Sequence, residues 1–281
     1  MLQEPAFTDL IRSALAEDIG NGDHSTLACI PADARGGARL KIKEDGVLAG
    51  MEVAEAIFRL LDASSVFKPF KKDGDSMKAG EVAFEVEAAV HTLLMGERLV
   101  LNCMQRMSGI ATLTRQYVDI LKGYHTRLLD TRKTTPNFRL LEKEAVRIGG
   151  GVNHRMGLYD MVMLKDNHID FSGGITAAVN KTVAYLQSKQ LPLQIEVETR
   201  NLEDVKEVLA VGQVHRIMLD NFSPAQISEA LALIDGRYET EASGGINLGT
   251  LEEYAKTGVD YVSVGAVIHH AVSLDLSLKA I

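Results

Sequence analysis

The chain has 281 residues, of which 46% are hydrophobic and 5% aromatic, with no tryptophan and a formal net charge of −8. This acidic balance argues against nucleic acid as the main partner, because phosphate binding along a strand needs a broad basic face. No apolar run approaches the roughly 20 residues that span a bilayer, so we expect a globular protein that does not enter a membrane.

The N-terminal segment MLQEPAFTDL is acidic where a secretory signal would be basic and then apolar. The cysteines, Cys29 and Cys103, lie in apolar surroundings. We interpret them as two buried thiols of a reducing compartment and not as disulfide or metal ligands. Together these features predict a cytoplasmic protein.

The first hundred residues predict a module of short helices and strands. Apolar residues at helical spacing indicate helices over residues 7–18 and 51–62, and strand-like patterns cover 39–47, 66–70 and 81–86. A long helical pattern follows from about residue 90, with a break expected near Gly109. This mixture is typical of an α+β arrangement.

Strands and helices then alternate regularly, which predicts a parallel sheet with helices outside it. The strand candidates are 127–129, 161–164, 193–197, 216–219, 238–242 and 261–264, separated by helical patterns at 138–148, 175–188, 202–209, 224–234 and 248–256. Polar groups follow six successive strands, more than the single crevice of a doubly wound sheet gathers. We therefore predict a βα-barrel, with fewer than eight strands because only about 170 residues are available for it.

Residues 130–169 form a basic island in this acidic chain, with seven Lys and Arg against five Asp and Glu. Such an island indicates a local site for a small anion, since cleft walls focus the field of nearby charges. The island also contains three threonines and the run Gly149–Gly151. Hydroxyls, guanidinium forks and exposed backbone N–H groups are suited to phosphate and carboxylate oxygens.

Three groups within this island are candidate site residues. Arg132 and Lys133 directly follow a predicted strand, and His154 and Arg155 follow the glycine run. Arg155 can hold a carboxylate with two hydrogen bonds, and His154 can add another. Lys165 ends an apolar strand, where it could serve as a Schiff-base nucleophile or as an anion-binding cation. The surrounding arginines favour anion binding.

Two carboxylates and two glycine loops complete the predicted site. Glu198 and Asp220 end neighbouring strands, so they can hold a divalent cation or accept hydrogen bonds from sugar hydroxyls. Glu196 lies on the same strand face as Glu198 and is an alternative. Backbone N–H groups after the late strands are the usual phosphate grip of barrels; here they belong to Ser243, Gly244, Gly245 and Gly265.

These motifs resemble the bacterial quinolinate phosphoribosyltransferases, also called nicotinate-nucleotide pyrophosphorylases, over nearly the full chain. The segments that carry the resemblance are AEDIGNGDHST, GVLAG, DGDSMKAGEV, GERLVLN, QRMSGIAT, DTRKTTP, GGGVNHRMGLYD, LKDNHI, IEVET, LDNF, ASGGI and VGAVIHH. The resemblance implies that quinolinate and phosphoribosyl pyrophosphate give nicotinate mononucleotide, pyrophosphate and CO2 with Mg²⁺ as cofactor. It also implies an N-terminal α/β sandwich domain over residues 1–108, an incomplete, open βα-barrel over 109–268 and a C-terminal segment, 269–281, that packs on the N-terminal domain.

The resemblance also implies roles for individual residues. Arg132, His154, Arg155 and Lys165 would hold the quinolinate carboxylates, with Arg98 contributed by the neighbouring subunit of a homodimer. Lys133, Ser243, Gly244, Gly245, Gly265 and His269 would hold phosphates, and Glu198 and Asp220 the ribose hydroxyls or the metal. Lys165, Glu198 and Asp220 would be the catalytic residues.

The chain departs from the family pattern at two places, and two other functions are alternatives to the one that the resemblance implies. Asn137 stands where many relatives have glycine, and asparagine tolerates the left-handed backbone that glycine would adopt. Either His269 or His270 could face the site, and assembly beyond a dimer is open. The alternatives are a paralogue of the same scaffold associated with molybdenum transport and a catalytically silent sugar-phosphate-binding protein. The intact Arg132, His154 and Arg155 disfavour the paralogue.

Overall fold

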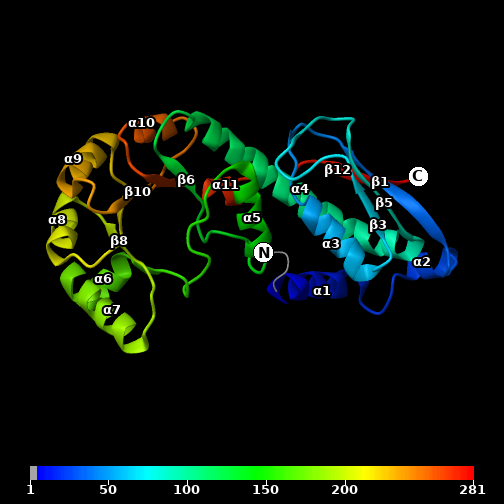
Figure 1. Ribbon diagram of the computed structural model, residues 1–281, viewed down its shortest axis with the longest axis horizontal. Helices are drawn as coiled ribbons and strands as arrows, with labels where there is room; N and C mark the ends of the chain where they lie inside the picture. Colours follow the sequence, from blue (N-terminus) through cyan, green and yellow to red (C-terminus); the bar gives the residue numbers. More distant parts are fainter. Residues whose placement is uncertain (1–4) are drawn as a thin grey trace. The chain divides into compact units, whose positions relative to one another are not determined.

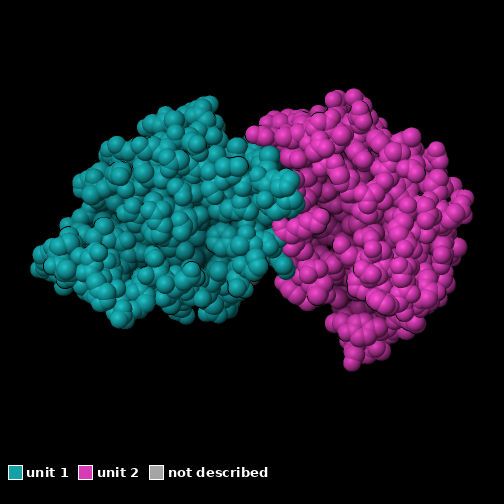
Figure 2. All heavy atoms as spheres, turned by 180° about the vertical axis from the view of Figure 1, so that it is seen from behind, with its two compact units in different colours: residues 1–115, 134–150, 267–281 teal, residues 116–133, 151–266 magenta. Residues whose placement is uncertain are grey.

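The structure is a computed structural model that describes residues 5–281 and forms two compact units (Figure 2). Unit 1 comprises the N-terminal residues up to 115 together with 134–150 and 267–281, and unit 2 comprises 116–133 and 151–266. Residues 1–4, the start of the segment compared above with a secretory signal, lie outside the described residues. The domain limits expected from the sequence stay predictions.

Unit 1 contains an antiparallel four-stranded sheet with helices packed on it (Figure 1). The strand order is β12-β1-β5-β3. The ring of Phe58 on α3 packs edge-on against Phe84 of β5, with centroids 6.3 Å apart. Helix α3 forms because its apolar residues recur on one face, which this sheet buries. The elements of unit 1 are α1 (Pro5–Ile19), α2 (His24–Cys29), β1 (Arg35–Ile42), β2 (Gly46–Val47), α3 (Met51–Leu61), β3 (Val66–Pro69), β4 (Ser76–Met77), β5 (Val82–Ala89), most of α4 (Val90–Ile120), α5 (Arg139–Gly149), most of α11 (Ala266–His269) and β12 (Leu276–Ala280).

The break expected near Gly109 is wrong, because α4 runs unbroken for 31 residues. A Cβ at Gly109 would overlap the carbonyl oxygen of Val272, so this glycine allows the C-terminal segment to pack close to the helix. The same segment is tied to α4 where the N–H of Leu274 donates to the carbonyl of Gln105 at 3.1 Å. Although α4 is long, neither it nor any other helix within residues 5–281 is apolar enough to cross a membrane.

An ion pair between a partly buried arginine and a fully buried glutamate joins three segments of unit 1. Arg106 on α4 donates from Nε to Glu142 Oε1 at 2.9 Å, and its two other nitrogens donate to the carbonyls of Ile268 and Ala271 at 2.8 and 2.7 Å. Glu142 on α5 is completely buried and also accepts the N–H and hydroxyl of Thr135 at 2.8 and 3.0 Å. One carboxylate and one guanidinium therefore fix the loop before α5 and the segment after α11.

Unit 2 contains six parallel strands in the order β6-β11-β10-β9-β8-β7. Because β11 pairs with β6, the strands curve back on themselves, whereas no pairing of β6 with β7 is found within residues 5–281. The predicted incomplete, open βα-barrel is therefore confirmed. Val152 forms an isolated parallel bridge with Leu129 beside this opening.

The helices of unit 2 follow the strands in turn and form an arc outside them (Figure 1). Asn201 caps α8 by accepting the N–H of Asp204, and Ser223 caps α9 ahead of Pro224, as their positions at helix starts favour. The predicted strands and helices are present with small shifts of their ends. The elements are β6 (Arg127–Leu129), β7 (Val162–Leu164), α6 (Asp166–Ser172), α7 (Ile175–Lys189), β8 (Ile195–Thr199), α8 (Leu202–Val211), β9 (Arg216–Asp220), α9 (Pro224–Ile234), β10 (Glu239–Ser243), α10 (Leu251–Ala255) and β11 (Tyr261–Ser263).

The two cysteines differ in exposure. Cys103 is buried as expected, and burial raises the pKa of its thiol to about 12. The prediction that Cys29 is buried is wrong: it lies exposed at the end of α2. A six-residue helix has too few turns to bury every apolar-looking position.

We expect one thiol to react rapidly in the native protein and two in the unfolded protein. Cys29 is accessible, whereas Cys103 is both buried and protonated, and only the thiolate is nucleophilic. Titration with a chromogenic disulfide reagent, with and without denaturant, measures the two counts. Cys29→Ser is the control. Rapid modification of two thiols in the native wild-type protein, or of any thiol in the native Cys29→Ser variant, would contradict the assignment of Cys29 as the exposed thiol and Cys103 as the buried one.

Candidate active site

Four of the predicted site residues lie side by side at the carboxyl ends of the barrel strands, an edge that we call the mouth. Lys165 follows β7, Glu198 lies near the end of β8, Asp220 ends β9 and Ser243 ends β10. The strand register brings these ends together, since Leu164 pairs with Val197, Thr199 with Leu219 and Ser243 with Asp220. The sheet therefore places their side chains along one edge.

Glu198 and Asp220 form a pair of neighbouring carboxylates. Glu198 is 9% exposed, and its Oε1 accepts the N–H of Asp166 at 3.3 Å. Burial raises the pKa of Glu198, the charge of Asp220 raises it further, and the charge of Lys165 opposes both. Two carboxylates that disfavour each other's charge provide a suitable site for a cation or for sugar hydroxyls.

Asp220 is held in place by the next strand. Its Oδ1 accepts the hydroxyl of Ser243 at 2.6 Å, and its Oδ2 accepts the side-chain N–H of Asn221 at 2.6 Å. Asn221 has a left-handed backbone, with φ 58°, and its N–H donates to the carbonyl of Ser243 at 2.8 Å. Gly244 packs directly against Asn221 with φ 93°, so the glycine is needed here both for its backbone conformation and for space.

Replacing Gly244 by alanine is expected to lower turnover at least about tenfold, because the added methyl group overlaps the side chain of Asn221 and shifts Asp220. Steady-state kinetics of the purified variant measure this. Gly236→Ala is a suitable control, since Gly236 also has a positive φ but a Cβ there meets open space. Equal losses in both variants would mean that backbone strain alone is responsible.

On the other side of the site, two arginines lie close together. Arg155 is 9% exposed, and both burial and the nearby charge of Arg132 lower its pKa. One guanidinium N–H of Arg155 donates to the carbonyl of Met161 at 3.1 Å. Nε of Arg132 is buried without a hydrogen-bond partner among residues 5–281. Two neighbouring guanidiniums with unused donors are suited to an anion that carries more than one carboxylate or phosphate oxygen.

The loop that carries Arg155 is shaped by Asp130, which is completely buried. Its Oδ1 accepts the backbone N–H of His154 at 2.8 Å, and its Oδ2 accepts the side-chain N–H of Asn153 at 2.6 Å. Val152 adds two backbone hydrogen bonds, to Leu128 and Asp130, which continue the sheet past β6. Asp130 thus fixes the chain immediately before Arg155.

His154 is buried, with both ring nitrogens facing protein groups. Its Nε2 lies 3.1 Å from Glu196 Oε2 and 3.2 Å from Glu241 Oε2, and its Nδ1 accepts the backbone N–H of Arg155 at 2.6 Å. Arg216 lies beyond the carboxylates, with Nη1 3.3 Å from Glu241. We call His154, Glu196, Arg216 and Glu241 the charge cluster. Glu196, which the sequence offered as an alternative to Glu198 for binding a cation or sugar hydroxyls, belongs to the buried charge cluster and not to the mouth.

The surroundings of His154 act in opposite directions on the protonation state of its ring. Burial lowers its pKa, but the two facing carboxylates outweigh burial and raise the pKa to about 9, which favours the charged ring. The hydrogen bond from Arg155 instead requires a lone pair on Nδ1 and therefore the neutral ring with its proton on Nε2. A charged ring would point an N–H at the N–H of Arg155, so the neutral ring is the one that fits this hydrogen bond.

The remaining predicted residues lie in both units. In unit 2, Lys133 is exposed, as are Lys165 and Gly245, and Gly265 directly precedes α11. In unit 1, Arg98 is exposed on α4, and His269 lies against His270 with ring centroids 4.4 Å apart. The structure thus brings together Arg132 with Arg155 and Lys165 with the two carboxylates and Ser243.

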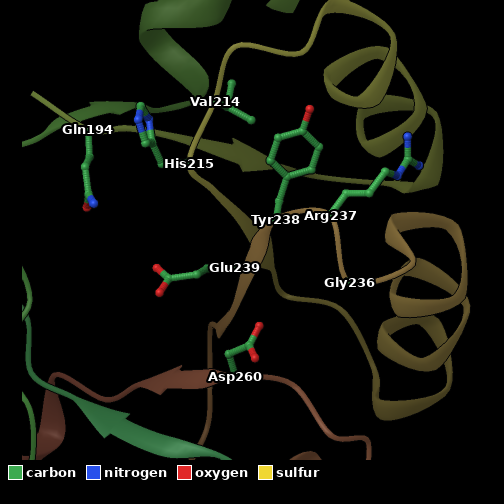
Figure 3. Close-up of a pocket in the computed structure, with 8 residues that line it drawn as sticks. All are labelled: Gln194, Val214, His215, Gly236, Arg237, Tyr238, Glu239 and Asp260. Atoms are coloured by element: carbon green, nitrogen blue, oxygen red, sulfur yellow. The ribbon is translucent and has the colours of Figure 1, made fainter.

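A cavity of about 530 Å³ lies at the opposite, amino-terminal ends of the strands (Figure 3). Several of its polar side chains are already hydrogen-bonded within the protein: Arg237 donates to the carbonyls of Leu233 and Ile234, and Asp260 accepts the N–H and hydroxyl of Thr240. His215 accepts the N–H of Ile195 at 3.0 Å. We therefore assign the candidate active site to the mouth, since the active sites of βα-barrel enzymes lie at the carboxyl ends of the strands.

Paired guanidiniums and paired carboxylates at the mouth of an open barrel suit polyanionic substrates, and comparison with known proteins gives the class, a phosphoribosyl transferase. The family model of the quinolinate phosphoribosyl transferase C-terminal domain matches residues 110–279, and that of the N-terminal domain matches residues 23–108. The chain belongs to the quinolinate phosphoribosyltransferase family.

Similar individual proteins support the same family assignment. A probable nicotinate-nucleotide pyrophosphorylase [carboxylating] of Synechocystis is 47% identical over 270 residues, which cover 95% of this chain and 90% of the relative. The chloroplastic nicotinate-nucleotide pyrophosphorylase [carboxylating] of Arabidopsis thaliana is 45% identical over 285 residues, covering 96% and 81%. The crystal structure of NadC from Streptococcus pyogenes has a TM-score of 0.90 and 42% identity and covers 98% of this chain and 96% of that one.

Proposed function

We propose that this chain transfers the phosphoribosyl group of phosphoribosyl pyrophosphate to the ring nitrogen of quinolinate. The products are nicotinate mononucleotide, pyrophosphate and CO2, in the de novo biosynthesis of NAD. Membership of the family supports the proposal. The structural observation that carries it is the pair formed by the buried Arg155 and Arg132, whose Nε is buried, because their close like charges suit a substrate with two adjacent carboxylates.

Both substrates are anions, and we propose that positively charged side chains and backbone N–H groups hold them. Arg132 and Arg155 bind the carboxylates of quinolinate, and the exposed Lys165 adds a third cation beside Glu198. The phosphates take the backbone N–H groups that follow the late strands, together with Lys133 and His269. The full set proposed for phosphate is Lys133, Ser243, Gly244, Gly245, Gly265 and His269.

Catalysis rests on positioning and electrostatics. Breaking the bond to pyrophosphate leaves positive charge on the ribose, which the carboxylates of Glu198 and Asp220 stabilise. Attachment to ribose makes the pyridine nitrogen cationic, so it stabilises the electron pair left on the neighbouring ring carbon when the carboxylate leaves as CO2, and that carbon then takes up a proton from water. No covalent intermediate with the enzyme is needed, because both steps proceed between bound groups.

Mg²⁺ is part of the proposal, with Glu198 and Asp220 as the residues that would hold it. Their mutual repulsion, which helps to raise the pKa of Glu198, is relieved by a divalent cation, and carboxylate oxygens are ligands that Mg²⁺ prefers. When bound, the ion would neutralise charge on the pyrophosphate. The same two carboxylates can instead accept hydrogen bonds from the ribose hydroxyls.

We further propose a homodimer in which Arg98 reaches the site of the neighbouring subunit. Arg98 is exposed on α4, where it is available to a second chain. Mixing inactive Arg98→Ala and Lys165→Ala chains should restore activity, because one of the two hybrid sites is then intact. Hybrids that form without activity would exclude a shared site, and sedimentation of the wild type measures assembly beyond a dimer.

The cytoplasmic location stays a proposal that rests on two unpaired cysteines. The Arabidopsis thaliana relative is by its name chloroplastic. Fractionation of cells that express the chain at its natural level would place it directly.

The reaction is tested by incubating the protein with quinolinate, phosphoribosyl pyrophosphate and Mg²⁺ and following nicotinate mononucleotide by chromatography. Nicotinate is the parallel substrate, and omission of Mg²⁺ with added chelator tests the metal. Product from quinolinate alone supports the proposal. Product from nicotinate alone, or none, would favour the paralogue or the silent binder. Borohydride trapping at Lys165 would instead indicate Schiff-base chemistry.

A further inference from the structure

Beneath the mouth, the charge cluster places four ionisable side chains almost entirely out of water. Glu196 and Glu241 are completely buried, while His154 and Arg216 are each 8% exposed. Burial, together with the charge of Glu241, raises the pKa of Glu196 to about 7. Such groups are costly to bury, and partners of opposite charge must offset the cost. The four side chains must therefore keep these positions, because each one offsets the cost of burying its neighbours.

The cluster extends from one end of the barrel interior to the other. At the amino-terminal ends of the strands, Arg216 bonds Glu239 at 2.8 Å, a residue that lines the cavity in Figure 3, and its guanidinium lies 4.4 Å over the ring of Tyr261. It then contacts Glu241, and Glu241 contacts His154. From His154 the contacts continue through the backbone N–H of Arg155, directly below the mouth.

We propose that His154 is a positioning residue that Glu241 and Arg216 hold in place, and that it orients Arg155 without itself binding quinolinate. Both ring nitrogens already face protein atoms, so a direct bond to a carboxylate would have to replace one of these contacts. This inference rests on the proposed function, since it concerns how the quinolinate-binding arginine is held. It reassigns the direct role that the family resemblance gives to His154.

Asp130 holds the same backbone from the other side. It accepts the N–H of His154 at 2.8 Å, so the chain entering Arg155 is fixed by Asp130 at the peptide and by the cluster at the ring. Within residues 5–281, the side chain of Arg155 then has one hydrogen bond of its own, to the carbonyl of Met161. The placement of its guanidinium consequently depends on the peptide that His154 and Asp130 fix.

A metal ion is the main alternative occupant. His154, Glu196 and Glu241 offer three ligand atoms within 4.8 Å of one another. However, Oε2 of Glu241, the oxygen that faces His154, lies 3.3 Å from Arg216, whose charge repels a cation. Binding through Nε2 would also require a proton on Nδ1, which accepts the N–H of Arg155. The contacts therefore favour a proton between these groups.

The kinetic test compares two substitutions of carboxylates that contact Arg216. Glu241→Gln keeps the shape but removes the charge that holds His154, and we expect KM for quinolinate to rise about tenfold or more. We expect kcat and KM for phosphoribosyl pyrophosphate to stay within about twofold. Glu239→Gln removes the charge of another partner of Arg216, one that has no ion pair with His154, and should leave all three constants within about twofold. Equal effects of both substitutions, or a loss confined to kcat, would overturn the proposal.

A spectroscopic test needs no turnover, so it separates this inference from the proposed reaction. Nitrogen-15 NMR of the histidine rings, with His154→Gln to assign the signal, should show a neutral ring with its proton on Nε2. Adding quinolinate should leave both ring nitrogens in that state. A change in the protonation of either nitrogen on adding quinolinate would establish direct binding and overturn the proposal. One equivalent of tightly bound metal that disappears in Glu241→Gln would also overturn it.

Discussion

Replacing Glu142 by alanine is expected to lower the free energy of unfolding by about 3–5 kcal/mol, as for other buried ion pairs from which one partner is removed. Glu142 is completely buried, and its loss leaves the guanidinium of Arg106, 23% exposed, without its counter-charge. The N–H and hydroxyl of Thr135 lose their acceptor as well. Chemical denaturation followed by circular dichroism measures the change.

Glu55→Ala is the matched control within unit 1. Glu55 pairs with Arg59 one helical turn away, with 37% and 58% of the side chains exposed, and such a surface pair contributes about 0.5 kcal/mol or less. A second control replaces Glu142 by leucine and Arg106 by methionine together, and we expect the double variant to lose less stability than the sum of the two single changes. A loss below about 1 kcal/mol in Glu142→Ala would show that Arg106 is satisfied by the two carbonyls alone.

The barrel strands could be placed from the sequence because buried parallel strands are short apolar runs bounded by turns. Val162–Leu164 and Arg216–Asp220 fall within one or two residues of their predicted limits. Helix α4 shows where this fails. Gly109 looks like a helix break in isolation, and its physical reason, the carbonyl of Val272, lies more than 160 residues away in the sequence. Local propensity does not contain such a contact.

The mouth was predictable for a related reason, because parallel strands deliver the residues after them to one edge. The charge cluster was not. Glu196 and Glu241 stand at alternate positions of their strands, a period-two signal of an inward face, but their partner His154 lies in an irregular loop. Asn137 confirms one prediction from residue chemistry, since its φ of 63° is the left-handed conformation expected of asparagine at a glycine position.

Arg155→Lys is expected to raise KM for quinolinate by about 30- to 150-fold, equivalent to about 2–3 kcal/mol for the loss of a charge-assisted pair of hydrogen bonds. Lysine keeps the charge but presents a single ammonium, so it cannot offer two parallel N–H groups to a carboxylate. It also has to give up the contact with the carbonyl of Met161 or the contact with substrate, since one nitrogen cannot replace both ends of the fork.

Arg237→Lys provides the matched control, because Arg237 also donates to backbone carbonyls but lies at the amino-terminal ends of the strands (Figure 3). Its KM for both substrates should stay within about twofold of the wild type. In Arg155→Lys, KM for phosphoribosyl pyrophosphate should also be unchanged, because most of the proposed phosphate-binding groups lie at the ends of β10 and β11. If Arg155→Lys changed both KM values together, the arginine would be maintaining the loop and not binding the dicarboxylate. A selective rise would assign the carboxylates of quinolinate to the Arg132 side of the mouth, and the ribose would then face Glu198 and Asp220.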